Sequence, residues 1–203
     1  MKQQEKTEAT KKELKKTARE LFLKKGYEET SISDIANQAG YSVGSVYRQW
    51  KSKQQLFMEI WDEYVSGYIR ESVIYAPENP DCEEMIEYLL KRSRKYAMQD
   101  MTKKLYPVSQ QLSAAYEYEG LADWAHKYQQ MLYLFLKQVS HSEDEEKLKT
   151  GAGILHCILN SDAMSETEIK SPRYDFKYGP LKECLIAIVK TCMDEKTDQE
   201  NQL

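Results

Sequence analysis

One short stretch, VGSVYRQ, contains Val43, Ser45 and Arg48. The side chains of these three residues are of types that can read DNA bases. An arginine guanidinium can donate two parallel hydrogen bonds to a guanine, a serine hydroxyl can bond to several bases, and a valine can touch a thymine methyl group. Arginine also binds phosphate, so both a base contact and a phosphate contact are open for Arg48. Residues of these types read bases only when one element presents them together on an exposed face.

The residues before this stretch predict a short helix and a tight turn. Ile35 and Ala36 belong to a helical spacing that predicts a helix over 33–39. Gly40 ends this helix, because glycine readily adopts the left-handed conformation that follows a last helical turn. Ser42 then suits the N-cap of the next helix, since its hydroxyl can accept a hydrogen bond from a free backbone N–H group.

The second helix is predicted over 43–49, and its two faces differ in character. Val46 and Trp50 are expected to face inward. Two short helices at an angle, with the second exposed, form a helix-turn-helix, whose second helix enters the major groove of DNA. The residues expected on or beside the outer face are Val43, Ser45, Tyr47 and Arg48.

Residues 40–44, GYSVG, also satisfy the pattern G-x-S-x-G of a serine hydrolase nucleophile. That motif needs a strand before the serine and a helix after it. Here a helix is predicted before Ser42, and no strand pattern lies nearby. We therefore interpret Ser42 as an N-cap, and we expect no catalytic residue, metal ligand or cofactor in this chain.

The stretch from Thr30 to Leu56 resembles the DNA-binding segment of the TetR family of transcriptional regulators. The resemblance covers about a quarter of the chain, and three positions depart from the family pattern: Tyr41 stands for Val, Val46 for Leu and Trp50 for Phe. The residues in register with the family pattern are Thr30, Ser31, Ile35, Ala36, Ala39, Gly40, Ser42, Gly44, Tyr47, Lys53 and Leu56.

The resemblance implies roles for several of these side chains. Tyr47 and Lys53 are expected on phosphates, and Gly44 is expected to let the DNA backbone approach closely. Many relatives have lysine where this chain has Val43, and partial packing into the core is an alternative role for Tyr47. The complete set expected at the DNA is Thr30, Ser31, Ser42, Val43, Gly44, Ser45, Tyr47, Arg48 and Lys53.

Two hydroxyl groups at the start of the first short helix have competing roles. Ser31 with Asp34 forms a capping-box pattern, with Asp in place of Glu. The hydroxyls of Thr30 and Ser31 can instead bind phosphate, and one oxygen atom serves both purposes poorly. Another capping pattern, Ser52 with Gln55, opens a long helix that reaches about Ile74.

Charge is distributed unevenly along the chain. The net charge is −4, but residues 1–56 hold 12 lysine and arginine residues against 7 acidic ones. A basic head on an acidic body is typical of a DNA-binding module attached to another domain. Lysines 11, 12, 15 and 16 crowd a helix predicted from about Thr10, where they form either a solvated face or a phosphate-binding face.

Composition indicates an all-α protein in the cytoplasm. With only 8 Gly and 5 Pro among 203 residues, long helices are favoured over many short strands. No apolar run is long enough for a membrane span, and the N-terminus lacks the apolar core of a signal peptide. The four cysteines are accordingly expected to be reduced and mostly buried.

About nine helices are expected, divided by role into three parts. Residues 8–52 form the helix-turn-helix domain, 53–76 a connecting helix, and 77–196 a helical ligand-binding and dimerisation domain. Pro107 is expected to mark a bend or a new helix start. Gly151 and Gly153 are expected to let another helix approach closely, and residues 1–9, 166–178 and 194–203 read as polar segments outside the helices.

A dimer and an effector follow from this layout. The last two long helices, around 145–164 and 181–193, are expected to form a homodimer contact, so that two recognition helices reach the half-sites of a palindromic operator. The alternative is that the core of the monomer uses the apolar stripes of both helices. The chain is rich in tyrosine, and aromatic walls suit a flat or cationic small molecule. An aromatic stripe at helical spacing is also typical of a plain hydrophobic core, which is the alternative role for these side chains. The residues proposed to line this pocket are Trp61, Tyr64, Tyr68, Tyr96, Trp124 and Tyr128.

The function expected from the sequence is therefore a ligand-responsive repressor that binds double-stranded DNA. The family resemblance implies that ligand binding releases the operator. The alternative is a helical adaptor that uses the helix-turn-helix surface for a protein partner. The two differ in salt dependence, because binding to duplex DNA weakens steeply as salt is added.

Overall fold

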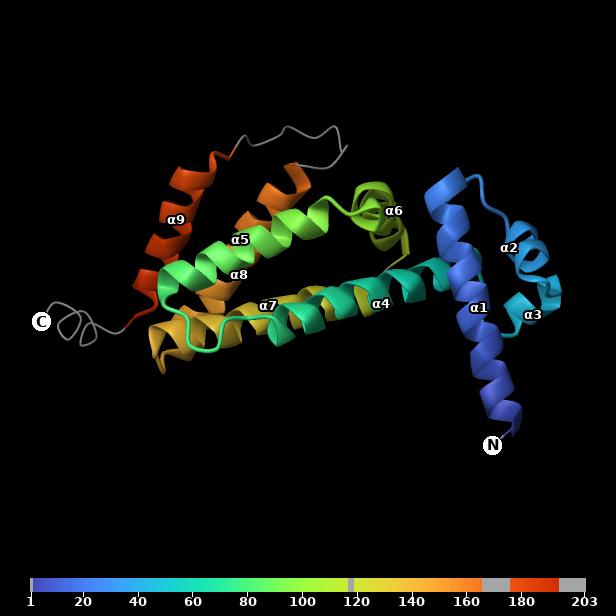
Figure 1. Cartoon of the computed structure of the whole chain (residues 1–203), viewed down its shortest axis with the longest axis horizontal. Helices are drawn as coiled ribbons and strands as arrows, with labels where there is room; N and C mark the ends of the chain where they lie inside the picture. Colours follow the sequence, from blue (N-terminus) through green and yellow to red (C-terminus); the bar gives the residue numbers. More distant parts are fainter. Residues whose placement is uncertain (1, 117–118, 166–175, 194–203) are drawn as a thin grey trace, which may run out of the picture. The chain divides into compact units, whose positions relative to one another are not determined.

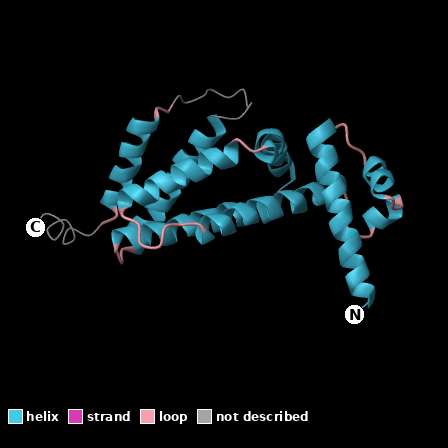
Figure 2. Ribbon diagram, in the orientation of Figure 1, coloured by secondary structure: helices cyan, strands magenta, loops and turns pink. Residues whose placement is uncertain are grey.

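The computed structural model describes residues 2–116, 119–165 and 176–193, without the side chains of residues 2–3, 114–116, 119–124 and 164–165. Over these residues the chain is all-α, with no strand, as the sequence predicts (Figures 1 and 2). None of the described helices is long and apolar enough to cross a membrane. The helices are α1 (Lys2–Lys25), α2 (Ile32–Ala39), α3 (Val43–Tyr47), α4 (Lys53–Ile74), α5 (Cys82–Ala97), α6 (Asp100–Tyr116), α7 (Glu119–Ser140), α8 (Glu145–Ser165) and α9 (Tyr178–Thr191).

Two compact units make up the chain. The first holds Met1–Val65 and Asp100–Leu121, and the second holds Ser66–Gln99 and Ala122–Leu203. Helix α4 therefore contributes its first half to one unit and its second half to the other. The division by role into residues 8–52, 53–76 and 77–196 stays a prediction, because compactness alone does not assign roles.

The first unit is built on the apolar face of α1. Leu14, Ala18 and Phe22 recur at helical spacing and are fully buried. Helix α2 packs on α1 and on α3. Phe22, Tyr27 and Phe57 form an aromatic trio with ring centroids 5.0–5.7 Å apart, which joins the end of α1 to the start of α4.

Helix α6 belongs to the first unit, although more than 30 residues separate it from the DNA-binding segment. It packs on α1, where Lys104 Nζ donates a hydrogen bond of 3.0 Å to the carbonyl of Leu23. It also meets α4, since the hydroxyls of Tyr64 and Thr102 lie 2.8 Å apart. Pro107 lies inside α6, so the prediction of a new helix start at this proline was wrong; the helix begins seven residues earlier.

The second unit buries apolar side chains from α5, α7, α8 and α9 around one core. Gly151 fits closely against the end of α9, because a Cβ atom there would lie 2.7 Å from Cys192 Sγ and would force a neighbouring side chain to shift. This confirms the prediction of a close helix approach at Gly151. The buried core residues include Ile86, Leu89, Leu90, Leu132, Leu136, Leu148, Ala152, Leu155, Leu159, Leu185 and Val189.

The start of α1 and the burial of the cysteines differ from the predictions. Helix α1 begins at Lys2, whereas the polar N-terminal residues had predicted a start near Thr10; no helix breaker stands between these positions. The cysteines are not mostly buried, because Cys157 and Cys184 are exposed and only Cys192 is buried. The polar segments predicted at 166–175 and 194–203 lie outside the described residues.

One ion pair stands out within the second unit. The guanidinium of Arg94 on α5 donates two hydrogen bonds, of 2.8 and 2.7 Å, to the carboxylate of Asp162 on α8. The Asp162 side chain is 1% exposed and that of Arg94 is 27% exposed. Because a buried carboxylate is costly without its partner, this pair ties α5 to α8.

We therefore predict that Arg94→Met lowers the free energy of unfolding by about 3 kcal/mol or more, since it leaves the buried Asp162 carboxylate without its cation. Arg94→Met/Asp162→Leu should recover most of this loss. Urea unfolding followed by circular dichroism measures both. Lys149→Gln, which breaks an exposed pair with Glu145, is the control and should leave the unfolding midpoint nearly unchanged. An equally small effect of Arg94→Met would contradict the assignment.

Candidate nucleic-acid interface

The turn between α2 and α3 has the geometry that the sequence predicts. Gly40 adopts the left-handed conformation, with φ +75° and ψ 27°, and its N–H bonds back to the end of α2. At the other end of α2, Ser31 and Asp34 form the complete capping box, with two bonds of 3.0 Å. The bond that the Ser31 backbone N–H donates to the Asp34 carboxylate is the main cause that lowers the pKa of this carboxyl. Both ends of α2 are therefore fixed locally.

Helix α3 is only five residues long and is held by what surrounds it. Ser42 is its N-cap, and the Ser42 hydroxyl accepts a bond of 3.2 Å from the Ser45 N–H. Val46 is fully buried and Trp50 is 1% exposed, as predicted. A helix this short is unstable in water alone, so these two anchors fix its direction.

The outward surface of α3 carries fewer side chains than predicted. Tyr47 is 54% exposed, and Arg48, Gly44 and Ser42 are also exposed, while Val43 is partly exposed. The exposure of Tyr47 contradicts its alternative role in the core. Ser31 is exposed at the start of α2. These side chains form the surface that we call the α3 face: Ser31, Ser42, Val43, Gly44, Tyr47 and Arg48.

Ser45 does not lie on this face, so its predicted outward position was wrong. The residue is 8% exposed, and its hydroxyl lies 2.9 Å from the Ser42 hydroxyl. The Ser45 hydroxyl also accepts a bond of 2.9 Å from the Arg48 guanidinium. Helical geometry places residues three apart above one another, so the three side chains form a chain that orients Arg48.

Thr30 and Lys53, both expected on phosphates, stabilise the turn after α1. Thr30 is fully buried, and its hydroxyl donates a bond of 2.7 Å to the carbonyl of Gly26. Lys53 Nζ donates bonds of 2.8 and 3.3 Å to the carbonyls of Tyr27 and Glu28, and it lies 4.2 Å from the Tyr27 ring centroid. Their contacts with DNA stay predictions, and the structure assigns both of them a role within the protein.

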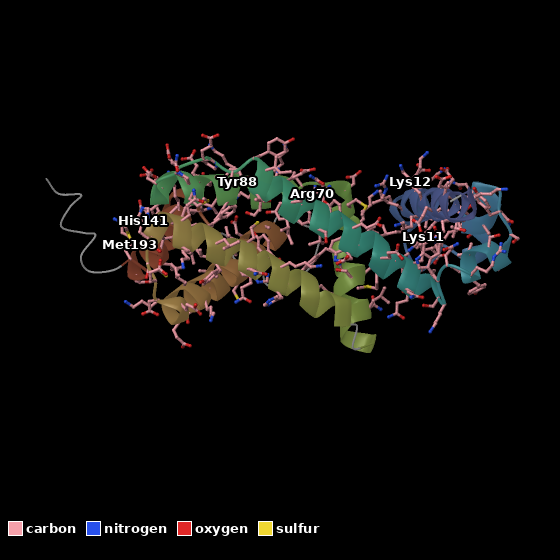
Figure 3. The ribbon with its side chains drawn as sticks, turned by 90° about the horizontal axis from the view of Figure 1, so that it is seen from below. Lys11, Lys12, Arg70, Tyr88, His141 and Met193 are labelled. Carbon is pink, nitrogen blue, oxygen red and sulfur yellow. The ribbon has the colours of Figure 1, made fainter. Side chains whose placement is uncertain are left out.

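The four clustered lysines of α1 fall into two pairs. Lys11 and Lys15 bind the Glu59 carboxylate of α4, at 2.9 and 3.0 Å, and Lys15 also binds Glu63. Burial lowers the pKa of Lys15, but its bonds to the two carboxylates outweigh burial and raise the pKa. Lysines 12 and 16 are exposed. Figure 3 shows the adjacent residues Lys11 and Lys12 on α1, where they project from different faces.

Glu59 is a residue of this site that the sequence interpretation missed. It accepts a bond of 2.7 Å from the Trp50 indole N–H besides its two lysine contacts. Burial raises its pKa, but the bonds from Lys11, Trp50 and Lys15 outweigh burial, so the net pKa is lowered. The available signal was an acidic residue inside the otherwise apolar run LFMEIW.

The structure brings together only part of the predicted ligand pocket. In the second unit, the rings of Tyr68 and Tyr96 lie 4.1 Å apart, and those of Tyr68 and Tyr128 lie 5.9 Å apart. Burial raises the pKa of the Tyr68 and Tyr128 phenols. Arg92 lies 5.3 Å from the Tyr68 ring. We call Tyr68, Tyr96 and Tyr128 the tyrosine cluster.

The remaining predicted pocket residues either belong to the first unit or have no described side chain. Trp61 and Tyr64 belong to the first unit, where Trp61 packs against Tyr106 with ring centroids 6.2 Å apart. The side chain of Trp124 lies outside the described residues. The pocket therefore stays a prediction, restricted to the tyrosine cluster.

Comparison with known proteins supports the reading of the first unit. Residues 14–60 match the family model described as bacterial regulatory proteins, tetR family. The HTH-type transcriptional regulator YerO of Bacillus subtilis is 40% identical over 50 residues, which are 25% of this chain and 17% of YerO. AcrR of Shigella flexneri is 34% identical over 61 residues, 30% of this chain and 28% of AcrR. The chain thus matches less than a third of each curated relative.

Comparison of folds shows a similarity to known structures that extends beyond residues 14–60. A transcriptional regulator from Saccharomonospora viridis, solved in complex with choline, superposes with a TM-score of 0.63 over 90% of this chain and 96% of its own. At 15% identity, this comparison speaks for the fold alone. The helix-turn-helix segment of this chain is thus similar to the tetR family of bacterial regulatory proteins, and the chain shares its all-α fold with the solved regulator.

Proposed function

We propose that this protein is a transcriptional repressor that binds a palindromic operator as a homodimer and is released by a small molecule. The observation that carries the proposal is the α3 face, which presents a guanidinium, a phenol and a bare glycine backbone from one anchored helix. This combination suits a major groove, because Arg48 can read a guanine while Tyr47 binds phosphate. The family is one of DNA-binding regulators and not of enzymes.

The glycine at position 44 supports the proposal that the α3 face contacts a partner outside the protein. A Cβ atom at this position would meet only the Ser42 hydroxyl, at 3.8 Å, and Gly44 does not have a positive φ. The fold therefore has no need for glycine here, although glycine weakens a helix relative to alanine. A close approach of the DNA backbone supplies the missing reason.

A dimer face is proposed on α8 and α9. A largely apolar groove of about 620 Å³ lies between these helices and is lined in part by Thr150, Ile154, Ala187 and Ile188. Ile154 remains 43% exposed there. Burying such a face against a second copy would supply the two α3 helices that a palindromic operator requires, since its half-sites lie about 34–36 Å apart.

The effector is proposed to bind at the tyrosine cluster. Stacked phenol rings suit a flat aromatic molecule or a cation, and the Saccharomonospora viridis protein was solved with the cation choline. In this chain Arg92 already lies against the Tyr68 ring, so a cationic effector must compete with that guanidinium. Such a ligand releases DNA only if it favours the conformation that binds DNA poorly. Helix α4 carries Tyr68 and also belongs to the first unit, so it is our candidate for the transmitting element.

Gly44→Ala tests the α3 face without disturbing the fold. We predict unchanged or slightly higher thermal stability, by roughly 0.5–1 kcal/mol at most, because alanine favours helix over glycine. Affinity for duplex DNA should fall at least about tenfold, a loss of roughly 1.4 kcal/mol or more. Fluorescence anisotropy with a labelled duplex measures the affinity. A stable variant that binds DNA as tightly as the wild type would argue against the α3 face and favour the adaptor alternative.

Arg48 and Ser45 provide a second prediction. Arg48→Ala should weaken binding and relax preference at one base pair, by about 1–3 kcal/mol of discrimination. Ser45→Ala should lose part of that same discrimination, because the guanidinium is no longer oriented. Tyr47→Phe, the control, should weaken all duplexes equally through a lost phosphate contact. Equal losses on operator and random DNA for Arg48→Ala would assign Arg48 to phosphate.

The dimer face makes a third prediction. Ile154→Glu should convert a dimer into a monomer in sedimentation velocity, since a charge would be buried in an apolar contact. Leu134→Glu on α7 is the control, because Leu134 is also exposed, at 57%, but lies outside the proposed face. If only the control variant dissociates, the dimer face lies on α7.

A further inference from the structure

Glu59 receives three hydrogen-bond donors from two different elements. Its Oε2 atom accepts the Trp50 indole N–H at 2.7 Å, and its Oε1 atom accepts Lys11 and Lys15 at 2.9 and 3.0 Å. Trp50 lies three residues after the end of α3, and both lysines belong to α1. One carboxylate of α4 thus binds the end of the recognition segment and two of the four clustered lysines.

Trp50 makes this arrangement possible. Its ring is 1% exposed, and Lys11 Nζ lies 5.8 Å from the ring centroid. A phenylalanine, which the family pattern has at this position, would fill the core but would offer no N–H group. The indole N–H therefore holds the Glu59 carboxylate where it faces Lys11 and Lys15.

The charges of this cluster cancel. Lys11 and Lys15 contribute two positive charges, while Glu59 and Glu63 contribute two negative ones. The side chains of Lys11 and Lys15 are only 28% and 16% exposed. Their neighbours on α1 differ, because Lys12 and Lys16 are exposed and have no ion pair within the described part of the chain.

We propose that Glu59 is a specificity-determining residue that withholds Lys11 and Lys15 from DNA phosphates, so that only Lys12 and Lys16 of the four clustered lysines contact the DNA backbone. Phosphate contacts strengthen binding to every sequence alike and supply nearly all non-specific affinity. Neutralising two of four lysines within the protein lowers this background. Base contacts from the α3 face then account for a larger share of the total affinity.

This inference rests on the proposed function, and salt dependence separates the two. Affinity for duplex DNA is measured by anisotropy on a random-sequence duplex between 50 and 200 mM salt. Each phosphate contact adds about 0.9 to the slope of log affinity against log salt, which is roughly a 3-fold greater loss over that range. A wild type without any salt-dependent binding would overturn the proposed function itself.

Paired lysine variants test the inference with the carboxylates in place. Lys12→Gln/Lys16→Gln should lower the slope by about 2, whereas Lys11→Gln/Lys15→Gln should change it by less than about 0.5. Both pairs remove the same charge from the same helix, so they control for each other. Equal reductions of the slope by the two pairs would overturn the inference while leaving the proposed function intact.

Glu59→Gln tests the carboxylate directly. The amide oxygen can still accept the Trp50 N–H, whereas the amide nitrogen cannot accept from Lys11 and Lys15, and the negative charge is lost. The slope should steepen by about 1 and non-specific affinity should rise at least about 3-fold at 50 mM salt. Glu13→Gln, which removes one charge from α1 at an exposed residue without a described ion pair, should change the slope by less than half as much. Equal effects of the two variants would show that Glu59 acts only through net charge, which would contradict the inference.

Discussion

The burial of Val46 and Trp50 is the constraint on which the rest of the DNA-binding unit depends. Helix α3 has five residues, too few to be stable in water without tertiary contacts. Its direction is set by these two side chains, by the Ser42 cap and by the left-handed Gly40 before it. Once α3 is fixed in this way, the exposure of Tyr47 and Arg48 follows from helical geometry.

Hydrogen bonds between polar side chains add to the constraint that the packing of Val46 and Trp50 sets. Ser45 orients Arg48, Lys53 bonds the carbonyls after α1, and Glu59 binds Trp50 from α4. Each of these side chains was available for a surface role but bonds within the protein instead. The basic excess of residues 1–56 therefore overstates the charge that DNA meets, since part of it is paired with Glu59 and Glu63. The surface proposed to contact DNA therefore carries less free positive charge than the composition suggests.

The sequence predicts the local features of this fold well and the long-range ones poorly. The Ser31–Asp34 capping box, the Gly40 stop and the Ser42 cap depend on residues within four positions, so their spacing was sufficient. The placement of α6 in the first unit depends on contacts with α1, which no local pattern records. Thr30 and Ser45 were expected at the surface, because residues with hydroxyl groups are usually exposed. Instead, the Thr30 hydroxyl donates a hydrogen bond to the Gly26 carbonyl, and the Ser45 hydroxyl accepts one from Arg48. The tyrosine cluster forms in part, since three of the six predicted pocket residues share the second unit.

We propose that a dimer of this protein reads a specific DNA sequence. Selection of bound duplexes from a random library by the purified full-length protein tests it most directly. The account predicts enrichment of a palindrome whose half-sites lie one helical turn apart, about 34–36 Å between centres. A folded protein that enriches no sequence at low salt, with and without candidate aromatic ligands, would contradict it.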